Sequence, residues 1–582
     1  MRQAFHKKTL FLLLATVLFV LPACSKSGGK YQGHSPLDPP VVGPVTPSGN
    51  FNVKGRVVDA STGKGLERVV VTDGTRCVLT DAEGVYRINS NVSIARFIYV
   101  STPSGYQPPV LKGLPIFYKV LSSVKPVDGV YDMGDFSLTP VANPDCFTLL
   151  VTADPQPRSS SAGYDKFGYH SLDICEDLYK ELKDVSDAIT DRQVIGLCLG
   201  DIVHENMNLF ANYRKGLSQL NYPTYNIIGN HDNDTSASDD DASAVPFESN
   251  FGPRYYSFNA GGVHFVVLDN LIMKKGSSGK LNAYDQGLTD EIWTWLQADM
   301  SYVPSSTLVM TASHSPMFKC DSGSERTNTA KHGGHTDPTG QYGYGDLFDG
   351  YDEVHAWAGH THSSFNYVYP TSHRHKHVQV HTVARSTGEL WTNEYLSDGT
   401  PRGFTVVEVD HGTVTWRFHP TRYQRPAWIG ASESGCSVQP PYQWRDWNYD
   451  ASGLAVMKDG GTLDEDYQLH VYPRGAYDDE YVYANVFLWD DKWQTPVFTP
   501  KGGAPVTMEK VTADSRYDLG TTEFRKVYKL YAPKLNGDNG YTAVNAGSIT
   551  TLFRAPAPKS PSGGSVSVTD RFGTTYARNV NW

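Results

Sequence analysis

Five short apolar segments in the middle of this chain each end at a polar side chain that can bind a metal ion. Short apolar runs of this kind are typical of strands that are buried on both faces of a sheet. Ligands collect beyond the carboxyl ends of such strands, so side chains that are remote in the sequence are expected to meet at one point. The five runs cover residues 149–153, 195–199, 225–228, 308–313 and 354–358.

The polar residues that follow these runs share a chemistry, because all of them offer oxygen or imidazole nitrogen. They are Asp154, Gln156, Asp201, Asn230, His314, His360 and His362. Such a set suits hard or borderline divalent cations. One buried Asp or His at a strand end is usually a satisfied polar group. That explanation does not account for a whole series of ligand-type residues at successive strand ends, so the pattern predicts a metal site.

Size and charge narrow the class of protein. The chain has 582 residues, of which 39% are hydrophobic, so more than one domain with a real core is expected. With a net charge of −11, the chain lacks the positive field that nucleic acid binding needs. No nucleic acid scaffold is therefore expected as a partner. A phosphorylated, anionic substrate would need local help from bound cations.

The first residues are predicted to be a targeting segment. Arg2, Lys7 and Lys8 precede an apolar stretch, residues 9–21, that is too short to span a bilayer comfortably. The stretch ends in Leu-Pro-Ala-Cys at Cys24, which resembles the lipobox of bacterial lipoproteins.

That resemblance implies a signal peptide over residues 1–23, cleavage before Cys24 and a lipid on its sulfur. The protein would then be extracytoplasmic and anchored to a bacterial membrane, in the periplasm or at the cell surface. The alternative is an ordinary secretory signal. Residues 24–50 are rich in Gly, Pro and Ser and are predicted to be a linker.

Three folded regions follow the linker. Residues 51–140 alternate apolar and polar positions between glycine turns, which predicts an antiparallel β-sandwich. This stretch resembles the transthyretin-like, carboxypeptidase-regulatory sandwiches of secreted bacterial proteins. Residues 145–422 alternate strand and helix patterns, which predicts an α/β domain. Residues 425–582 are rich in Tyr, Trp, Asp and Gly, which indicates a second β-rich domain.

Several elements of the α/β region can be predicted individually. Apolar residues recur at helical spacing over residues 172–189 and 210–220. Thr289 is a candidate N-cap with acidic residues after it. A hairpin is expected across Gly261 and Gly262. Cys175 and Cys198 fall in apolar patterns and are predicted to be buried free thiols.

The order of the motifs resembles that of the calcineurin-like metallophosphoesterase family. The motifs are Asp154-x-Gln156, Gly200-Asp201, Gly229-Asn230-His231-Asp232, His314 and Gly359-His360-x-His362. The flanking β regions resemble accessory domains found beside some bacterial members. The resemblance implies a core built as a two-sheet α/β sandwich flanked by helices.

The resemblance also implies an activity, the hydrolysis of phosphomonoesters or phosphodiesters by a dinuclear metal centre and a bridging hydroxide. One metal ion would be held by Asp154, Gln156, Asp201 and His362, and the other by Asp201, Asn230, His314 and His360. Asp201 would bridge the two ions. His231 would donate a proton to the leaving oxygen, and Asp232 would orient its ring.

Two positions depart from the family pattern. Gln156 stands where most members have His, and its neutral oxygen favours manganese, magnesium or ferrous iron over zinc, with the choice among the four left open. His204 stands where purple acid phosphatases have a metal-bound tyrosine, which argues against a ferric, coloured centre. His204 could contact the substrate or a metal ion, or lie behind the ligands.

A function of another class is a catalytically inert surface lipoprotein that acts as a glycan- or protein-binding module. The two large β regions and a lipid tether would suit such a role. The intact Asn230-His231-Asp232 set argues against it.

Overall fold

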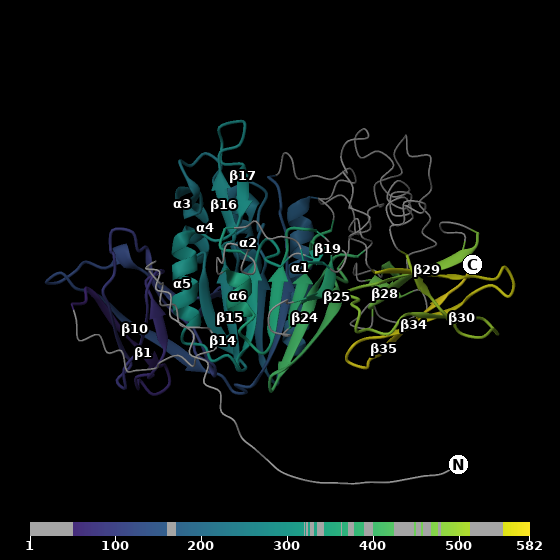
Figure 1. Ribbon diagram of the computed structural model, residues 1–582, viewed down its shortest axis with the longest axis horizontal. Coiled ribbons are helices and arrows are strands. Elements are labelled where there is room, and N and C mark those ends of the chain that lie inside the picture. Colours follow the sequence, from purple (N-terminus) through teal and green to yellow (C-terminus); the bar gives the residue numbers. More distant parts are fainter. Residues whose placement is uncertain are drawn as a thin grey trace, which may run out of the picture.

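The computed structural model shows three regions in a row, with an N-terminal β domain, a central α/β core and a C-terminal β domain (Figure 1). It describes residues 50–159, 170–318, 320–321, 324–325, 331–333, 343–362, 364–370, 377–388, 400–423, 447–449, 455–457, 467–474, 479–511 and 551–582. The predicted signal peptide, Cys24 and the linker up to residue 49 lie outside the described residues.

The core contains two sheets that face each other. The first has the order β13-β12-β11-β24-β25, and the second has the order β14-β15-β18-β21-β23-β22. Strands β11, β12 and β13 run parallel, and so do β15, β18, β21 and β23. The bounds are β11 (Cys146–Thr152), β12 (Gln193–Cys198), β13 (Thr224–Asn226), β24 (Gly403–Asp410), β25 (Thr413–Pro420), β14 (Tyr256–Ala260), β15 (Val263–Leu268), β18 (Leu308–Ser313), β21 (Val354–Ala358), β22 (Phe365–Pro370) and β23 (His377–Thr382).

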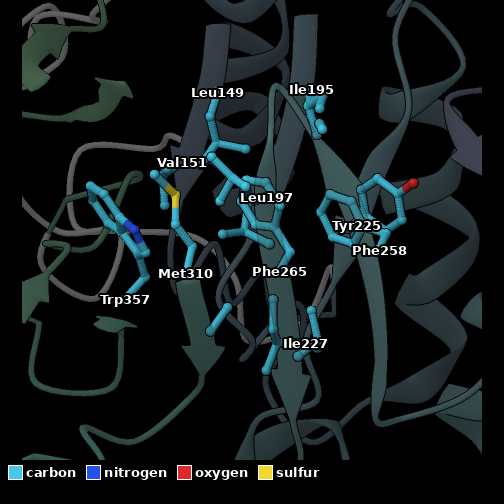
Figure 2. Close-up of a cluster of buried hydrophobic side chains, with 14 of the residues drawn as sticks. Leu149, Val151, Ile195, Leu197, Tyr225, Ile227, Phe258, Phe265, Met310 and Trp357 are labelled. Carbon is cyan, nitrogen blue, oxygen red and sulfur yellow. The ribbon is translucent and has the colours of Figure 1, made fainter. Parts of the chain in front are cut away.

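Apolar side chains from both sheets meet between them and exclude water. Figure 2 shows Leu149, Val151, Ile195 and Leu197 of the first sheet near Phe265 and Met310 of the second, all buried. The rings of Tyr225 and Phe258 stack with their centroids 3.8 Å apart. Because both faces of these strands are buried, the corresponding runs of the sequence are apolar throughout and do not alternate with polar residues.

Helices cover the outer faces of the sheets. Helices α1 (Ser171–Ala188) and α2 (Phe210–Leu217) pack on the first sheet, and α5 (Asp290–Met300) and α6 (Tyr344–Phe348) pack on the second. Thr289 caps α5 by accepting a hydrogen bond from the Ile292 N–H, as predicted. The two-sheet α/β sandwich is therefore confirmed.

Smaller elements complete the core. The expected hairpin across Gly261 and Gly262 forms between β14 and β15. Cys175 and Cys198 are buried free thiols, as predicted. The remaining short elements of the core are α3 (Asp240–Ser243), α4 (Val245–Phe251), β16 (Leu271–Lys274), β17 (Ala283–Gln286), β19 (Cys320–Asp321), β20 (Ser324–Glu325), η2 (Met207–Leu209) and η3 (Asn230–Asp232).

The N-terminal domain is a sandwich of two four-stranded sheets, and one of its strand pairs departs from the antiparallel pairing that we predicted. Strands β1 and β10 are parallel neighbours, with Val53 opposite Tyr131. Alternation along a strand reveals which face is buried, and it carries no information about the direction of the neighbour. The sheets are β4-β1-β10-β6 and β3-β2-β5-β9, with β1 (Val53–Asp59), β2 (Val70–Thr72), β3 (Cys77–Leu79), β4 (Val85–Ile88), β5 (Phe97–Val100), β6 (Tyr106–Gln107), β9 (Tyr118–Val120) and β10 (Tyr131–Pro140). Short pieces are β7 (Val110–Leu111), β8 (Leu114–Pro115) and η1 (Leu121–Ser123).

The C-terminal region is β-rich, as predicted, and its described part holds two four-stranded sheets around a core of its own. Their orders are β28-β29-β33-β32 and β31-β30-β34-β35. The bounds are β28 (Leu469–Tyr472), β29 (Tyr481–Val486), β30 (Val497–Pro500), β31 (Val506–Thr507), β32 (Glu509–Lys510), β33 (Leu552–Pro556), β34 (Gly564–Thr569) and β35 (Thr575–Val580), with the pair β26 (Trp447–Tyr449) and β27 (Ala455–Met457) nearer the core in sequence. Within the described part of the chain, no helix has the length and apolar character needed to cross a membrane.

Candidate metal centre

The predicted ligands lie beyond the carboxyl ends of five strands. Asp154 and Gln156 follow β11, Asp201 follows β12, and Asn230 follows β13. In the second sheet His314 follows β18, and His360 and His362 follow β21. Because the strands of each set are parallel and in register, their ends bring these side chains together.

The side chains form two groups that share one carboxylate. Ligand atoms of Asp154, Asp201 and His362 all lie within 4.8 Å of one another, and so do those of Asp201, His314 and His360. His314 Nε2 is 3.3 Å from Asp201 Oδ1, and His362 Nε2 is 3.6 Å from Asp154 Oδ1. Asp201 therefore lies between the two groups.

The two amide residues join the same network. Asn230 Oδ1 lies 3.1 Å from His314 Nε2. The Gln156 amide donates a hydrogen bond to Asp201 Oδ2. All seven side chains that the sequence analysis selected as ligands thus converge at one place in the structure.

The backbone at this place is strained. Five of the seven ligand residues have a positive φ, a region that non-glycine residues rarely adopt and that costs on the order of 1–2 kcal/mol each. The values are +50° for Asp154, +37° for Gln156, +50° for Asp201, +66° for His360 and +56° for His362. Hydrogen bonds hold the strained loops, for example from the Asp154 N–H to the Gly200 carbonyl (3.1 Å). Strain of this kind gathers at functional sites, where the fold maintains it.

Two glycines permit the close approach of these loops. A Cβ at Gly229 would lie 2.2 Å from the Asp201 backbone nitrogen and side chain. A Cβ at Gly359 would lie 2.6 Å from Asp154 Oδ2. Any larger residue would push the carboxylates out of place.

The site holds two buried carboxylates whose negative charges a bound cation would neutralise. Asp154 is 0% and Asp201 is 1% exposed, and their ion-pair partners among the described residues are histidines. Burial alone would lower the pKa of His314, but the nearby Asp201 and Asp154 carboxylates raise it to about 10. Burial and the His314 charge lower the pKa of His360 to about 4. Buried carboxylates, amide oxygens and imidazoles fit divalent cations well.

His231 lies beside the ligands. Its backbone N–H donates to Asp201 Oδ1 (2.9 Å), and its ring stacks on His204 with centroids 4.4 Å apart. His231 Nδ1 is 3.3 Å from Glu205 Oε1. His204 Nε2 in turn lies 2.9 Å from Arg158 Nη2.

Asp232 occupies a different position from the one expected. Its two carboxylate oxygens accept hydrogen bonds from the backbone N–H groups of Ile202, Val203 and Gly229, at 2.9 to 3.1 Å. The carboxylate that lies against the His231 ring belongs to Glu205 instead. The reason is that Asp232 is fully buried behind the loop, where the loop N–H groups need an acceptor.

Three further residues touch the centre, and sequence reasoning missed two of them, Glu205 and Tyr284. Glu205 contacts His231, the Tyr284 hydroxyl lies 3.0 Å from His360 Nε2, and Arg385 Nε donates to the Asp154 carbonyl (3.0 Å). Tyr284 lies on β17 and Arg385 follows β23, both far in sequence from their partners. No local spacing signals such contacts.

Three family models match the chain and together span nearly all of it beyond the linker. They are described as the N terminal of calcineurin-like phosphoesterase (residues 51–141), calcineurin-like phosphoesterase (residues 147–364) and the C terminal of calcineurin-like phosphoesterase (residues 381–576).

The chain belongs to the calcineurin-like phosphoesterase family.

Solved structures with a similar fold are distant from this phosphoesterase. They include a purple acid phosphatase from yellow lupin (Lupinus luteus; 13% identity, TM-score 0.32, 47% of this chain and 52% of that one), a dimetal phosphatase from Danio rerio (15%, 0.28, 47% and 96%) and a 5'-nucleotidase from Candida albicans (12%, 0.27, 48% and 54%). The match thus spans only about half of the lupin and Candida proteins. No curated protein sequence matches the chain significantly. The family membership and the ligand groups support metal-dependent hydrolysis of phosphoesters.

Proposed function

We propose that this calcineurin-like phosphoesterase hydrolyses phosphate esters with two divalent cations at the strand ends of the core. The observation that carries the proposal is the sharing of Asp201 between the two ligand groups. Asp154, Gln156, Asp201 and His362 would hold one cation, and Asp201, Asn230, His314 and His360 the other. When bound, the cations would neutralise the phosphate oxygens and produce a nucleophile from water at neutral pH.

The chain's own residues supply the rest of the chemistry. Glu205 lies next to His231 Nδ1 and stabilises a proton on that atom, which leaves Nε2 to exchange a proton with the leaving group. Stacking on His204 holds the ring in place. Asp232 keeps the loop in shape by binding the N–H groups of Ile202, Val203 and Gly229.

The amide of Gln156 favours manganese, magnesium or ferrous iron in its site, since a neutral oxygen is a harder ligand than imidazole. The substrate class is a phosphomonoester or a phosphodiester. The overall charge of −11 makes the bound cations the main attraction for an anionic substrate.

The test is hydrolysis of an aryl phosphate and of the matching diaryl phosphate by the full chain. The protein is first stripped with a chelator and then supplied with Mn²⁺, Mg²⁺, Fe²⁺ or Zn²⁺ in turn. We expect turnover of at least one ester with at least one metal, and none by the Asp201→Asn variant. Absence of turnover with every metal would overturn the proposal in favour of an inert binding module.

We also propose that a lipid on Cys24 anchors the protein to a bacterial membrane, from the sequence of residues 1–24. The Cys24→Ala variant should leave the membrane fraction, whereas the unchanged chain should need detergent for extraction. Equal extraction of both chains without detergent would contradict the anchor.

A further inference from the structure

A second group of metal-binding side chains lies at the opposite end of the first sheet. Cys146 is the first residue of β11, and its partner across the antiparallel pair is Asp410, the last residue of β24. His411 follows in the turn to β25. The candidate metal centre follows the other end of β11, a strand of seven residues, so the two places are separated by about 20 Å.

The three side chains are close enough to share one ion. Cys146 Sγ lies 3.1 Å from Asp410 Oδ1 and 3.6 Å from His411 Nδ1, and the Asp410 and His411 atoms are 2.5 Å apart. Around a tetrahedral zinc ion with bonds of about 2.0–2.3 Å, ligand atoms lie roughly 3.3–3.7 Å from one another. The sulfur–nitrogen distance already fits. The other two are shortened by hydrogen bonds that an ion would replace, and side-chain shifts below about 1 Å would open them.

The backbone sets up this arrangement. Cys146 and Asp410 are cross-strand partners, so their side chains project from the same face of the sheet. His411 has φ +48° and Gly412 φ +80°, the geometry of a two-residue hairpin turn in which Asn, Asp or Gly is favoured at the first position. His411 is of a residue type that adopts a positive φ more often than most non-glycine residues. Its N–H is held by the Asp145 carbonyl at 3.0 Å, which keeps the residue beside Cys146.

The surroundings leave the group open to an ion. The side chains of Asp410 and His411 are 61% and 74% exposed, so a water molecule can complete the coordination. Arg192, a cationic side chain whose charge acts on Cys146 and Asp410, is paired with Asp191 at 3.0 Å. The hydrogen bond to Asp410 raises the pKa of the Cys146 thiol, so without a cation this cysteine is a poor nucleophile.

We propose that Cys146, Asp410 and His411 form a separate site for Zn²⁺ or a cation of similar softness, with the thiol ionised on binding. A thiolate, an imidazole and a carboxylate are the ligands that zinc takes, and an open fourth position is usual for sites that are not purely structural. The thiol proton is released when the ion binds. This site is independent of the phosphoesterase proposal, since it shares no residue with the metal centre.

Co²⁺ gives a spectroscopic signal at this site that the candidate metal centre cannot produce. Co²⁺ bound to a thiolate gives a sulfur-to-metal charge-transfer band, and none of the seven predicted ligands at the candidate metal centre is a cysteine. Co²⁺ is titrated into the full chain while the band is recorded. We expect the band to saturate as Co²⁺ is added and to be lost in Cys146→Ser, which keeps every other cysteine.

Two further variants keep the test decisive. His411→Asn retains a residue that tolerates the left-handed turn, and it should weaken Co²⁺ binding at least tenfold without lowering the melting temperature. Asp201→Asn should leave the band intact, because it alters only the candidate metal centre. A band that is missing in the unchanged chain, or that persists in Cys146→Ser, would overturn the proposal.

Discussion

At the scale of single residues, the metal centre depends most on Asp201, because its two oxygens face different partners. Oδ1 accepts the His231 N–H and lies near His314, and Oδ2 accepts the Gln156 amide. Burial by itself would raise the pKa of this carboxyl, but the positive charges on His314 and His231 lower it overall. Asp201 is therefore the charge around which the other predicted ligands are arranged.

Asp201→Asn should weaken both cations at once, since the shared charge is lost while the shape is kept. Metal content after dialysis, measured by elemental analysis, checks this. The control is Asp299→Asn, another buried carboxylate, which bonds Ser257 and His264 away from the centre. Two ions per chain in Asp201→Asn would refute the shared role.

His231→Ala should retain its metals and lose about 10²–10⁴-fold in kcat, the usual contribution of a general acid. The reason is that His231 lies beside the proposed ligands and is not one of them in the proposed arrangement. Steady-state kinetics on a phosphate ester, with metal content measured on the same sample, would show it. An unchanged kcat would remove His231 from the reaction.

At the scale of elements, the β16–β17 hairpin, near the upper edge of the core in Figure 1, contacts the centre through Tyr284. Its base is tied to the residue after His314, since Gln286 donates to the Ser315 hydroxyl and Asn270 donates to the Ser315 carbonyl (2.6 Å). From this hairpin Tyr284 reaches His360 Nε2, while His360 Nδ1 faces His314 at 3.1 Å. The hairpin thus fixes the orientation of a ligand ring.

Tyr284→Phe should reduce metal affinity by about 10–100-fold, the usual effect of removing the partner of a ligand histidine. The ring is kept, so stability should change by no more than about 1 kcal/mol. Titration of the stripped protein with Mn²⁺ measures the affinity. Tyr302→Phe, which removes a hydroxyl bonded to the Cys77 carbonyl, is the matched control and should bind Mn²⁺ normally.

At the scale of the whole molecule, the flanking domains are packed into the core. Phe117 of the N-terminal domain lies against Tyr256 of the second sheet, with ring centroids 4.7 Å apart. The Asn259 N–H donates to the Thr102 carbonyl at 2.7 Å, which adds a bridge between the two domains. On the other side, the buried Gln468 side chain pairs with both backbone groups of Phe418. These contacts favour unfolding as one unit.

Phe117→Ala should lower the free energy of unfolding by about 3–5 kcal/mol, because it leaves a cavity in the seam between the N-terminal domain and the core. Denaturation followed by tryptophan fluorescence and by circular dichroism measures this. The two probes should give coincident transitions in the unchanged chain. Two separate transitions there would show that the domains unfold independently.

Local pattern was enough to predict the runs that become β11, β12, β18 and β21, the helix α1 and the cap at Thr289. Apolar periodicity and capping depend on residues that are near neighbours in the chain, so they can be recognised from the sequence without knowledge of the fold. The seven predicted ligands could be selected for the same reason, since each lies within four residues of the end of a strand. Their convergence, with Asp201 between two groups, required the strands to be parallel and in register.

Tertiary structure alone decided the parallel pairing of β1 with β10, the contact of Glu205 with His231, the position of Tyr284 over His360 and the meeting of Cys146 with Asp410 and His411. Each joins segments whose neighbours in space are set by how sheets pair and hairpins dock. The residue types that the sequence contains determined which chemistry is possible. Packing determined which of those residues meet, because strand pairing and burial depend on contacts between distant parts of the chain.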